Sequence, residues 1–501
     1  MGMDGRTPVI VGVGQHTNRT NEGAEPLSPV EMMLEATAAA DKDSGAAFAH
    51  RADAVATVPI VSWKYTDPGR LVAEALGNDR ATTWYPAMGG NSPQMLLNRL
   101  CNSIAAGEMS VGLLCGGEAW LSTGRARRAG EDLGWPTQTK GKPGWGSEDK
   151  FSMGHPAELA HGIIKPVDTY PLFETALMHA AIEEHPGRAM DDQLRQVGEM
   201  WAGFSRVAAH NPYAWSRSEL TAEQIITPTE DNRYVSWPYT KRMVSNPNVD
   251  MASALIVTSV EAAEAAGVAR DRWVFPHSGT DGKDRIMSER NSFVRSPSVG
   301  VAGRRCLELS GVTLDDVSHL DVYSCFPSAV QLFCHEMGIE PLDRPLTVYG
   351  GLSFGGGPWN NPVGHALAAM VGVLRDDPGT LGLVTANGGN VDKHAFGLLG
   401  TDPPTSGWRH EVPQSEIDAS VAGRTVLTDY TGPVTVEAYS VVHDRHRNRE
   451  RLIASNLTPE GNRVWGVSKD ADLMETAESS DLVGTSAHVG DEAFLTVAGS
   501  P

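Results

Sequence analysis

Residues 321–390 carry the pattern that decides the fold: DVYSCFP at 321–327, GGLS at 350–353, NNPVGH at 360–365 and ANGGN at 386–390. Each block ends an apolar run or opens a stretch with helical periodicity. Glycines at such points mark tight turns and places where another group approaches the main chain closely. The pattern therefore predicts one site that is assembled from several loops at the ends of strands.

The first half of the chain has a similar order of elements. Residues 8–14 (PVIVGVG) are typical of a strand buried on both faces of a parallel sheet. Residues 28–40 begin with Ser-Pro, which suits the N-cap and first residue of a helix. The turn AMGGNSP at 87–93 leads into a predicted helix, and the apolar run 111–117 predicts a further strand. Residues 248–259 are predicted to form a turn, the start of a helix and a strand. Strands alternating with helices indicate an α/β fold with a largely parallel sheet, and the repeated order suggests an internal duplication.

Composition limits the classes of partner. The chain has 501 residues, 41% of them hydrophobic, and a formal net charge of −21. This charge argues against nucleic acid or an anionic membrane as the main partner. The five cysteines form no CxxC pair, which is typical of reduced thiols, and we find no metal-ligating motif. With neither a signal peptide nor an apolar run of about 18 residues, we expect a cytoplasmic protein without a membrane span.

Two stretches interrupt the α/β pattern. Residues 122–240 are rich in Trp, Gly, Pro and His and predict an inserted lobe, which either closes over the site or only packs against it. Near the C-terminus, short alternating segments indicate a small β-barrel-like domain. The predicted domains are an N-terminal half at 1–265, a C-terminal half at 266–405 and the β-domain at 406–501. Within that domain the basic run HDRHRNR at 443–449 is typical of a solvated turn.

Together, the blocks resemble the thiolase superfamily, most closely the thiolase-like proteins near the sterol-carrier thiolases. DMASA at 250–254 is similar to the family's DGAAA block, and YSCF at 323–326 to its NEAF or HDCF block. The glycine pair 350–351 with NPVG at 361–364 resembles GG...HPxG, and ANGG at 386–389 resembles CxGGG. The resemblance implies a duplicated, five-layered α/β/α/β/α core and acyl groups that are carried on coenzyme A (CoA).

The same resemblance assigns the family's catalytic positions. The nucleophilic cysteine falls on Met88, the oxyanion-hole residue on Tyr323 and the second cysteine on Ala386. The histidine that activates the nucleophile falls on Asn361, although His365 follows in the same block. Methionine cannot form a thiolate or an acyl thioester, so we do not expect the ordinary thiolase reaction.

Three functions remain open. The first is a thiolase-like protein of the acetyl-CoA acetyltransferase family that binds CoA or an acyl-CoA in lipid metabolism, as a monomer or homodimer and without a covalently bound cofactor. The second is a lyase that cleaves a β-hydroxyacyl-CoA by a retro-aldol reaction, with Tyr323 as base and His365 or His394 stabilising its phenolate. The third is a non-catalytic interaction protein whose β-domain docks a partner. The candidate site residues are Tyr323 and His365 for catalysis, and Gly350, Gly351, Ser353, Asn387 and Gly388 for contact with the ligand.

Overall fold

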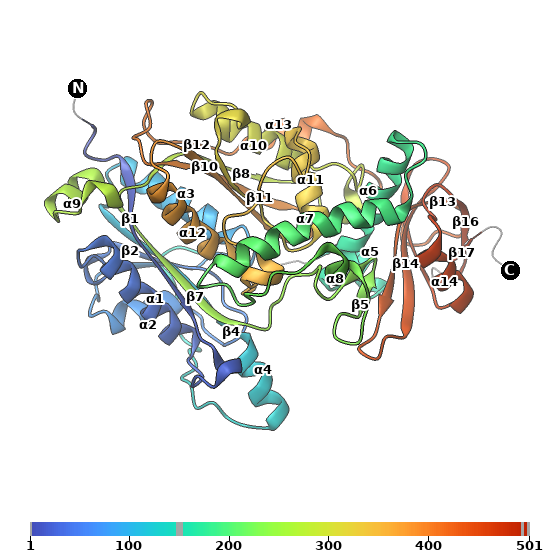
Figure 1. The fold of residues 1–501 in the computed structure, drawn as a ribbon, viewed down its shortest axis with the longest axis horizontal. Coiled ribbons are helices and arrows are strands. Elements are labelled where there is room, and N and C mark those ends of the chain that lie inside the picture. Colours follow the sequence, from blue (N-terminus) through green and yellow to red (C-terminus); the bar gives the residue numbers. More distant parts are fainter. Residues whose placement is uncertain (1–2, 147–153, 492–494, 498–501) are drawn as a thin grey trace.

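A computed structural model describes residues 3–146, 154–491 and 495–497 of the chain. Two five-stranded sheets form the core of the molecule (Figure 1). The first sheet has the order β1-β7-β4-β2-β3, with β1 at Pro8–Thr17, β2 at Ala54–Thr57, β3 at Thr82–Trp84, β4 at Val111–Ala119 and β7 at Asp250–Ser259. The second has the order β12-β8-β11-β10-β9, with β8 at Phe275–Lys283, β9 at His319–Asp321, β10 at Leu381–Gly388, β11 at Lys393–Gly400 and β12 at Arg409–Glu411.

Helices form three layers around these sheets. Helices α1 and α2 cover the outer face of the first sheet, α3 and α12 lie between the two sheets, and α10 covers the second sheet with α11 beside it (Figure 1). Their bounds are α1 Pro29–Ser44, α2 Pro68–Ala75, α3 Ser92–Ala105, α9 Val260–Ala265, α10 Pro297–Leu309, α11 Pro327–Met337 and α12 Pro362–Asp376. This is the α/β/α/β/α order, so the predicted fold class is confirmed.

The contact between α1 and β1 shows how local sequence sets these layers. Ser28 caps α1 in a capping box with Glu31, and proline occupies the first turn, as predicted. A Cβ added at Gly12 would lie 2.2 Å from the Ala40 carbonyl oxygen, and one at Gly14 would lie 1.9 Å from that of Ala36. The two glycines of β1 therefore let the helix backbone rest directly on the strand.

The first sheet is largely parallel, as predicted, with one strand reversed. Strand β7 pairs antiparallel with both β1 and β4, whereas β2 runs parallel to β4 and β3. The helix start predicted within 248–259 is wrong, because β7 is one strand with all of its residues buried. Helices cover both faces of the sheet, and an apolar run buried in this way carries no information about strand direction.

The second sheet repeats the strand directions of the first. Strand β10 runs parallel to β9 and antiparallel to β11, and β11 runs antiparallel to β8. Strands β8, β11, β10 and β9 thus correspond in order and direction to β1, β7, β4 and β2. The internal duplication suggested by the order of elements is present in the fold.

The stretch predicted as an inserted lobe joins the core to the C-terminal region. Helix α6 packs against α11 of the core and against β13, and β5 pairs antiparallel with β13. The stretch is therefore integrated into both neighbours. Its described elements are α4 Trp120–Ala129, α5 Pro156–Ala160, α6 Pro166–Glu184, α7 Met190–His210, α8 Ala222–Ile226, β5 Tyr234–Trp237 and β6 Tyr239–Thr240.

The C-terminal region forms an antiparallel sheet in the order β15-β14-β13-β16-β17, to which β5 and β6 are added. The bounds are β13 Gly432–His443, β14 Arg449–Leu457, β15 Arg463–Ser468, α14 Ala471–Ser479, β16 Ser486–Val489 and β17 Leu495–Val497. Before it, β12 and α13 (Gln414–Ser420) pack on the second core sheet. The domain boundary at residue 406 stays a prediction. None of the helices in the described part of the chain is long and apolar enough to cross a membrane.

A buried ion pair anchors this C-terminal sheet to the core. The Arg463 side chain is fully buried, and its Nη2 lies 2.7 Å from Oε1 of Glu437. The same guanidinium donates to the carbonyl oxygens of Met287, Ser288 and Arg290, which precede α10. One charged side chain therefore satisfies acceptors on both sides of the contact.

Strand β3 lies at the edge of the first sheet, and Trp145 pairs with it. The Tyr85 N–H donates to the Trp145 carbonyl at 2.9 Å, and the Trp145 N–H donates to the Thr83 carbonyl at 3.1 Å. The Trp84 and Trp145 rings meet edge to face at 6.0 Å, and the Arg99 guanidinium lies 4.0 Å from the centroid of Trp145.

Candidate functional site

Four loops meet where β10 ends and α3 begins, and Tyr323 lies at their centre. The Tyr323 N–H donates to Thr385 Oγ1 at 2.9 Å, and the side chain is almost completely buried. A Cβ added at Gly90 would lie 2.2 Å from Tyr323 Oη and 2.4 Å from the Asn387 carbonyl oxygen. The turn before α3 is thus packed directly onto Tyr323 and Asn387.

A second tyrosine completes this cluster. Tyr170, on α6, donates from Oη to the Gly389 carbonyl at 3.2 Å and accepts from Asn387 Nδ2 at 3.1 Å. Asn387 Nδ2 also lies 3.9 Å from Cys325 Sγ. The Tyr170 ring stacks on Phe326 at 4.3 Å. We call Tyr170, Tyr323, Cys325 and Asn387 the tyrosine cluster.

Burial keeps the titratable groups of the tyrosine cluster neutral. It raises the pKa of Cys325 to about 12 and the pKa values of Tyr323 and Tyr170 well above 10. A charged form is disfavoured because the surrounding protein solvates it poorly. At physiological pH the cluster therefore offers hydrogen-bond donors, and it contains neither a thiolate nor a phenolate.

Three positions that the resemblance assigns to thiolase catalysis carry neither a cysteine nor a histidine. The Met88 side chain is 36% exposed, and its carbonyl oxygen accepts from Lys393 Nζ at 3.4 Å. Asn361 is buried, and its Nδ2 donates to the Gly116 carbonyl at 2.9 Å and to Ser253 Oγ at 3.0 Å. The Asn361 amide is therefore fixed onto β4 and β7. Ala386 lies within β10, opposite Ala395. The assignment of Met88, Asn361 and Ala386 to the family's positions stays a prediction.

Asn360, which the sequence reasoning did not single out, fixes the turn before α3. Its Oδ1 accepts from the Gly89 N–H at 3.1 Å, and its Nδ2 donates to the Pro59 carbonyl at 3.0 Å. One buried amide thus connects three segments that are distant in sequence. Its place in the block NNPVGH, beside Asn361, was the available signal.

His365 belongs to the packing between β1 and α12. Its Nδ1 lies 2.8 Å from Gln15 Oε1, and its ring stacks on Tyr349 with centroids 5.8 Å apart. Burial lowers the pKa of His365 to about 3, so the ring is neutral. These contacts bind Nδ1 to Gln15 and place the ring on Tyr349, and the role of His365 in stabilising a Tyr323 phenolate stays a prediction.

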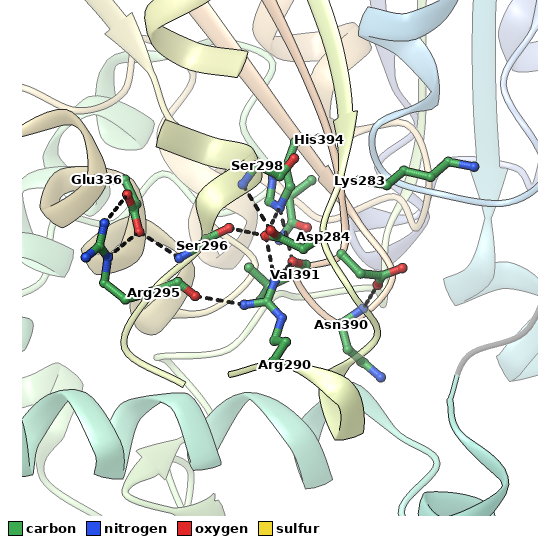
Figure 2. A network of polar contacts seen from close by, with 12 residues as sticks. Lys283, Asp284, Arg290, Arg295, Ser296, Ser298, Glu336, Asn390, Val391 and His394 are labelled. Carbon is green, nitrogen blue, oxygen red and sulfur yellow. Dashed lines mark hydrogen bonds and ion pairs between the residues drawn. The ribbon is translucent and has the colours of Figure 1, made fainter. Parts of the chain in front are cut away.

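His394 lies in a separate polar network before α10, shown in Figure 2. Its Nε2 is 3.1 Å from the Val391 carbonyl and 3.7 Å from Asp284 Oδ2. The same carboxylate accepts from Arg290 Nη2 at 2.8 Å and, through Oδ1, from the Ser298 N–H at 3.0 Å. Burial lowers the pKa of His394 to about 4. The network holds the start of α10 against the loop after β10.

The predicted ligand contacts fall in two places. Gly350 and Gly351 have positive φ angles of 100° and 70°, and they meet α7: a Cβ at Gly350 would lie 2.5 Å from Ala208 Cβ, and one at Gly351 would lie 2.5 Å from Phe204 Cδ1. Ser353 Oγ accepts from Trp201 Nε1 at 3.1 Å. This turn, including the π-helical segment Gly351–Gly355, is therefore covered by α7. Asn387 and Gly388, in contrast, lie at the tyrosine cluster and beside the turn before α3.

A surface pocket of ≈ 330 Å³ opens beside the same turn. Met88 and Asn91 line it, whereas Gly90 faces Tyr323, so the turn separates the pocket from the tyrosine cluster. Lys283 and Lys393 supply positive charge to a chain whose net charge is −21. We call this cavity the turn pocket.

Comparisons with known proteins agree with this geometry. The model of the additional C-terminal domain of thiolase-like protein type 1 matches residues 412–493. The crystal structure of a monomeric SCP2-thiolase-like protein type 1 (STLP1) from Mycobacterium smegmatis is 31% identical, covers 99% of this chain and 100% of its own, and superposes with a TM-score of 0.83. No curated protein matches the chain.

More distant structures share the fold of the core. Human mitochondrial 3-ketoacyl-CoA thiolase is 16% identical over 79% of this chain and 100% of its own, with a TM-score of 0.57. The Ltp2-ChsH2(DUF35) aldolase is 18% identical over 79% of this chain and 98% of its own, with a TM-score of 0.58. The layered, duplicated core with its four-loop site thus defines a thiolase-like protein. Within that class, the chain belongs to the family of SCP2-thiolase-like proteins type 1.

Proposed function

We propose that this protein binds an acyl-CoA thioester and does not carry out the thiolase reaction. The observation that carries the proposal is the position of Gly90. A Cβ added at this residue of the turn would point at Tyr323 and Asn387. A thiolase needs a thiol on this turn to form the acyl-enzyme, and neither Gly90 nor Met88, to which the resemblance assigns the nucleophile, carries one. Glycine offers no side chain, and the neighbouring Cys325 is protonated because burial raises its pKa to about 12.

The turn pocket supports the binding half of the proposal. Lys283 and Lys393 suit the phosphates of CoA, and the backbone N–H groups at the start of α3 add a partial positive charge. Met88, Met95 and Trp145 provide an apolar wall for the pantetheine arm or the acyl chain. The pocket therefore combines the two chemistries that an acyl-CoA requires.

Calorimetric titration with CoA, acetyl-CoA and a long-chain acyl-CoA tests the proposal. We expect saturable binding that Lys283→Gln and Lys393→Gln each weaken by about tenfold, since each removes one charge-assisted contact to phosphate. Lys42→Gln is the matched control, because Lys42 is an exposed lysine on α1. Absence of binding, or an equal loss in the Lys42 variant, would refute an acyl-CoA site in the turn pocket.

A second candidate is retro-aldol cleavage of a β-hydroxyacyl-CoA. It is favoured by the two phenols of the tyrosine cluster and by the shared fold with the Ltp2-ChsH2(DUF35) aldolase. In this reaction the β-hydroxyl loses its proton, the Cα–Cβ bond breaks, and the electron pair passes to Cα, which is then protonated to release a shorter acyl-CoA and a carbonyl compound. Tyr323 or Tyr170, each a neutral phenol, would give its own proton to Cα and take up the proton that the β-hydroxyl releases, so that the phenol is regenerated.

Release of the carbonyl product from a β-hydroxyacyl-CoA is the measurement that decides between the two candidates. If the lyase function is correct, Tyr323→Phe abolishes product release while calorimetry still shows acyl-CoA binding. Binding without product from the unmodified protein leaves the first candidate standing and excludes the second for the substrates used.

A further inference from the structure

A pocket of ≈ 500 Å³ lies where the C-terminal sheet meets the loop that precedes β5. The tip of the β13–β14 hairpin forms one side, and α14 closes the floor. We call it the hairpin pocket. The residues that matter to its chemistry are Arg233, Tyr234, His443, Arg447, Arg449 and Glu478.

In one wall of the hairpin pocket, the carboxylate of Glu478 is bound by side chains of the same wall. The Glu478 carboxylate lies 2.9 Å from His443 Nε2, and it accepts from Arg449 Nε at 3.0 Å and Nη2 at 2.9 Å. The His443 ring packs on the Tyr234 ring with centroids 5.5 Å apart and an interplanar angle of 37°. These contacts place two aromatic rings beside the pocket. The Glu478 carboxylate neutralises the charge of Arg449.

Arg447 is held at the tip of the hairpin in an uncommon backbone conformation. Its φ is +73°, a left-handed value that most residues avoid. The Asp444 carboxylate fixes this turn by accepting from the N–H groups of His446 at 2.7 Å and Asn448 at 2.9 Å. Non-glycine residues in this region concentrate at ligand sites and switch regions, where the surrounding structure enforces them.

Two guanidinium groups of the pocket, those of Arg233 and Arg447, form no ion pair with any residue that the structure describes. Arg233 Nη1 donates to the Tyr234 carbonyl at 2.6 Å. Both arginines nevertheless line the same cavity in a chain of net charge −21. Arginine forks match the geometry of phosphate oxygens, and the rigid wall keeps Glu478 occupied with its own partners.

We propose that the hairpin pocket binds the phosphate group of a small phosphorylated molecule through Arg233 and Arg447. The cavity volume of ≈ 500 Å³ and the flanking Tyr234 and His443 rings fit a compact ligand that carries a phosphate and a planar or apolar part. This inference does not rest on the acyl-CoA proposal, because none of the described residues lines both the hairpin pocket and the turn pocket.

Titration of the full chain with pyrophosphate tests this inference. We expect saturable binding that weakens with ionic strength and falls about tenfold or more in Arg233→Gln and in Arg447→Gln, the loss of one charge-assisted hydrogen bond. Arg445→Gln is the matched control: it removes the same charge from the same hairpin tip, but Arg445 bonds His446 and does not line the pocket. Its affinity should stay within about twofold of the unmodified protein.

Three results would overturn the inference. They are no saturable binding of pyrophosphate, an equal loss in the Arg445 variant, or binding only to vesicles that contain phosphatidic acid, which would indicate a lipid surface. Lys283→Gln separates this site from the turn pocket, since it should weaken acyl-CoA and leave pyrophosphate at the hairpin pocket unchanged. Failure of either site therefore leaves the other testable.

Discussion

Replacing Gly90 by alanine tests whether the turn before α3 is closed against Tyr323. The new Cβ would lie 2.2 Å from Tyr323 Oη and 2.4 Å from the Asn387 carbonyl oxygen, where ordinary contacts begin at 3.4 Å. The turn or its neighbours must therefore move by about 1 Å, and overpacking of this kind in a packed interior costs about 1–3 kcal/mol of unfolding free energy. We expect a lower midpoint of urea unfolding, followed by tryptophan fluorescence.

Two further variants make the Gly90 measurement decisive. Gly372→Ala, in α12, places its Cβ where no atom lies within 4 Å, so it should stabilise the protein by about 0.5–1 kcal/mol. Tyr323→Phe in the Gly90→Ala background removes Oη but leaves the Asn387 contact, so it should recover about 0.5–1 kcal/mol. If Gly90→Ala unfolds at the same urea concentration as the unmodified protein while Gly372→Ala shows its gain, the turn has room for a side chain. A nucleophilic side chain would then fit at that point of the turn.

Three other outcomes follow from the positions of Asn361, Arg463 and Glu118, the last a buried residue of β4. Met88→Cys should show no thiolysis of acetoacetyl-CoA, because Asn361 offers no imidazole to activate a thiol; turnover in a spectrophotometric assay would contradict this. Arg463→Met should lower the unfolding free energy by about 3 kcal/mol, because Glu437 then keeps only the Ser455 hydroxyl at 2.9 Å and Arg424 at 3.8 Å. A double variant with Glu437→Met should be less destabilised. If Arg463→Met and the unmodified protein have equal urea midpoints, the anchoring role is refuted. Burial raises the pKa of Glu118 from 4.5 to about 7, so its contribution to stability is complete below pH 4.5 and is lost as the pH rises through 7. Stability measured against pH should therefore fall less steeply over this range in Glu118→Gln than in the unmodified protein.

The sequence predicted elements well where apolar runs or helix caps are strong. The strand predicted over 8–14 is present within β1, and the strand predicted over 111–117 is present within β4. The Ser-Pro start of α1 was read correctly because the N-cap and the first-turn proline are local signals. Such elements need no knowledge of the rest of the molecule.

Strands β8 and β11 were not predicted, because their residues suit close packing in the fold and do not form a local strand pattern. The sequence of β8, FPHSGTDGK, is poor in β-branched and aromatic residues, yet most of the strand is buried. A Cβ at Gly279 would lie 2.3 Å from Asn98 Oδ1, and one at Gly282 would lie 2.7 Å from Ile417 Cδ1. Glycine is needed there for close approach, and the resulting pattern looks like a turn when read along the chain.

The candidate site shows the same division between local and distant signals. Tyr323 and Asn387 were both predicted at the site, because each lies in a block of the resemblance. Tyr170 was not, since it comes from a helix in the inserted stretch and nothing in its own neighbourhood points to the core. The glycine pair at 350–351 was predicted to contact a ligand, but the element that approaches its backbone closely is α7. A glycine indicates that something approaches the backbone, and only the fold shows what it is.

The pairing of Trp145 with β3 has a consequence for association between copies of this chain. A strand with free N–H and C=O groups at the edge of a sheet is where another molecule can add its own strand and continue the sheet across an interface. Here two of the groups that such a strand would use are already bonded within one molecule, and Arg99 lies over the ring that covers them. Edge-to-edge assembly at β3 would first have to break these bonds. Each copy therefore completes its own sheet, and with it the support for its own four-loop site.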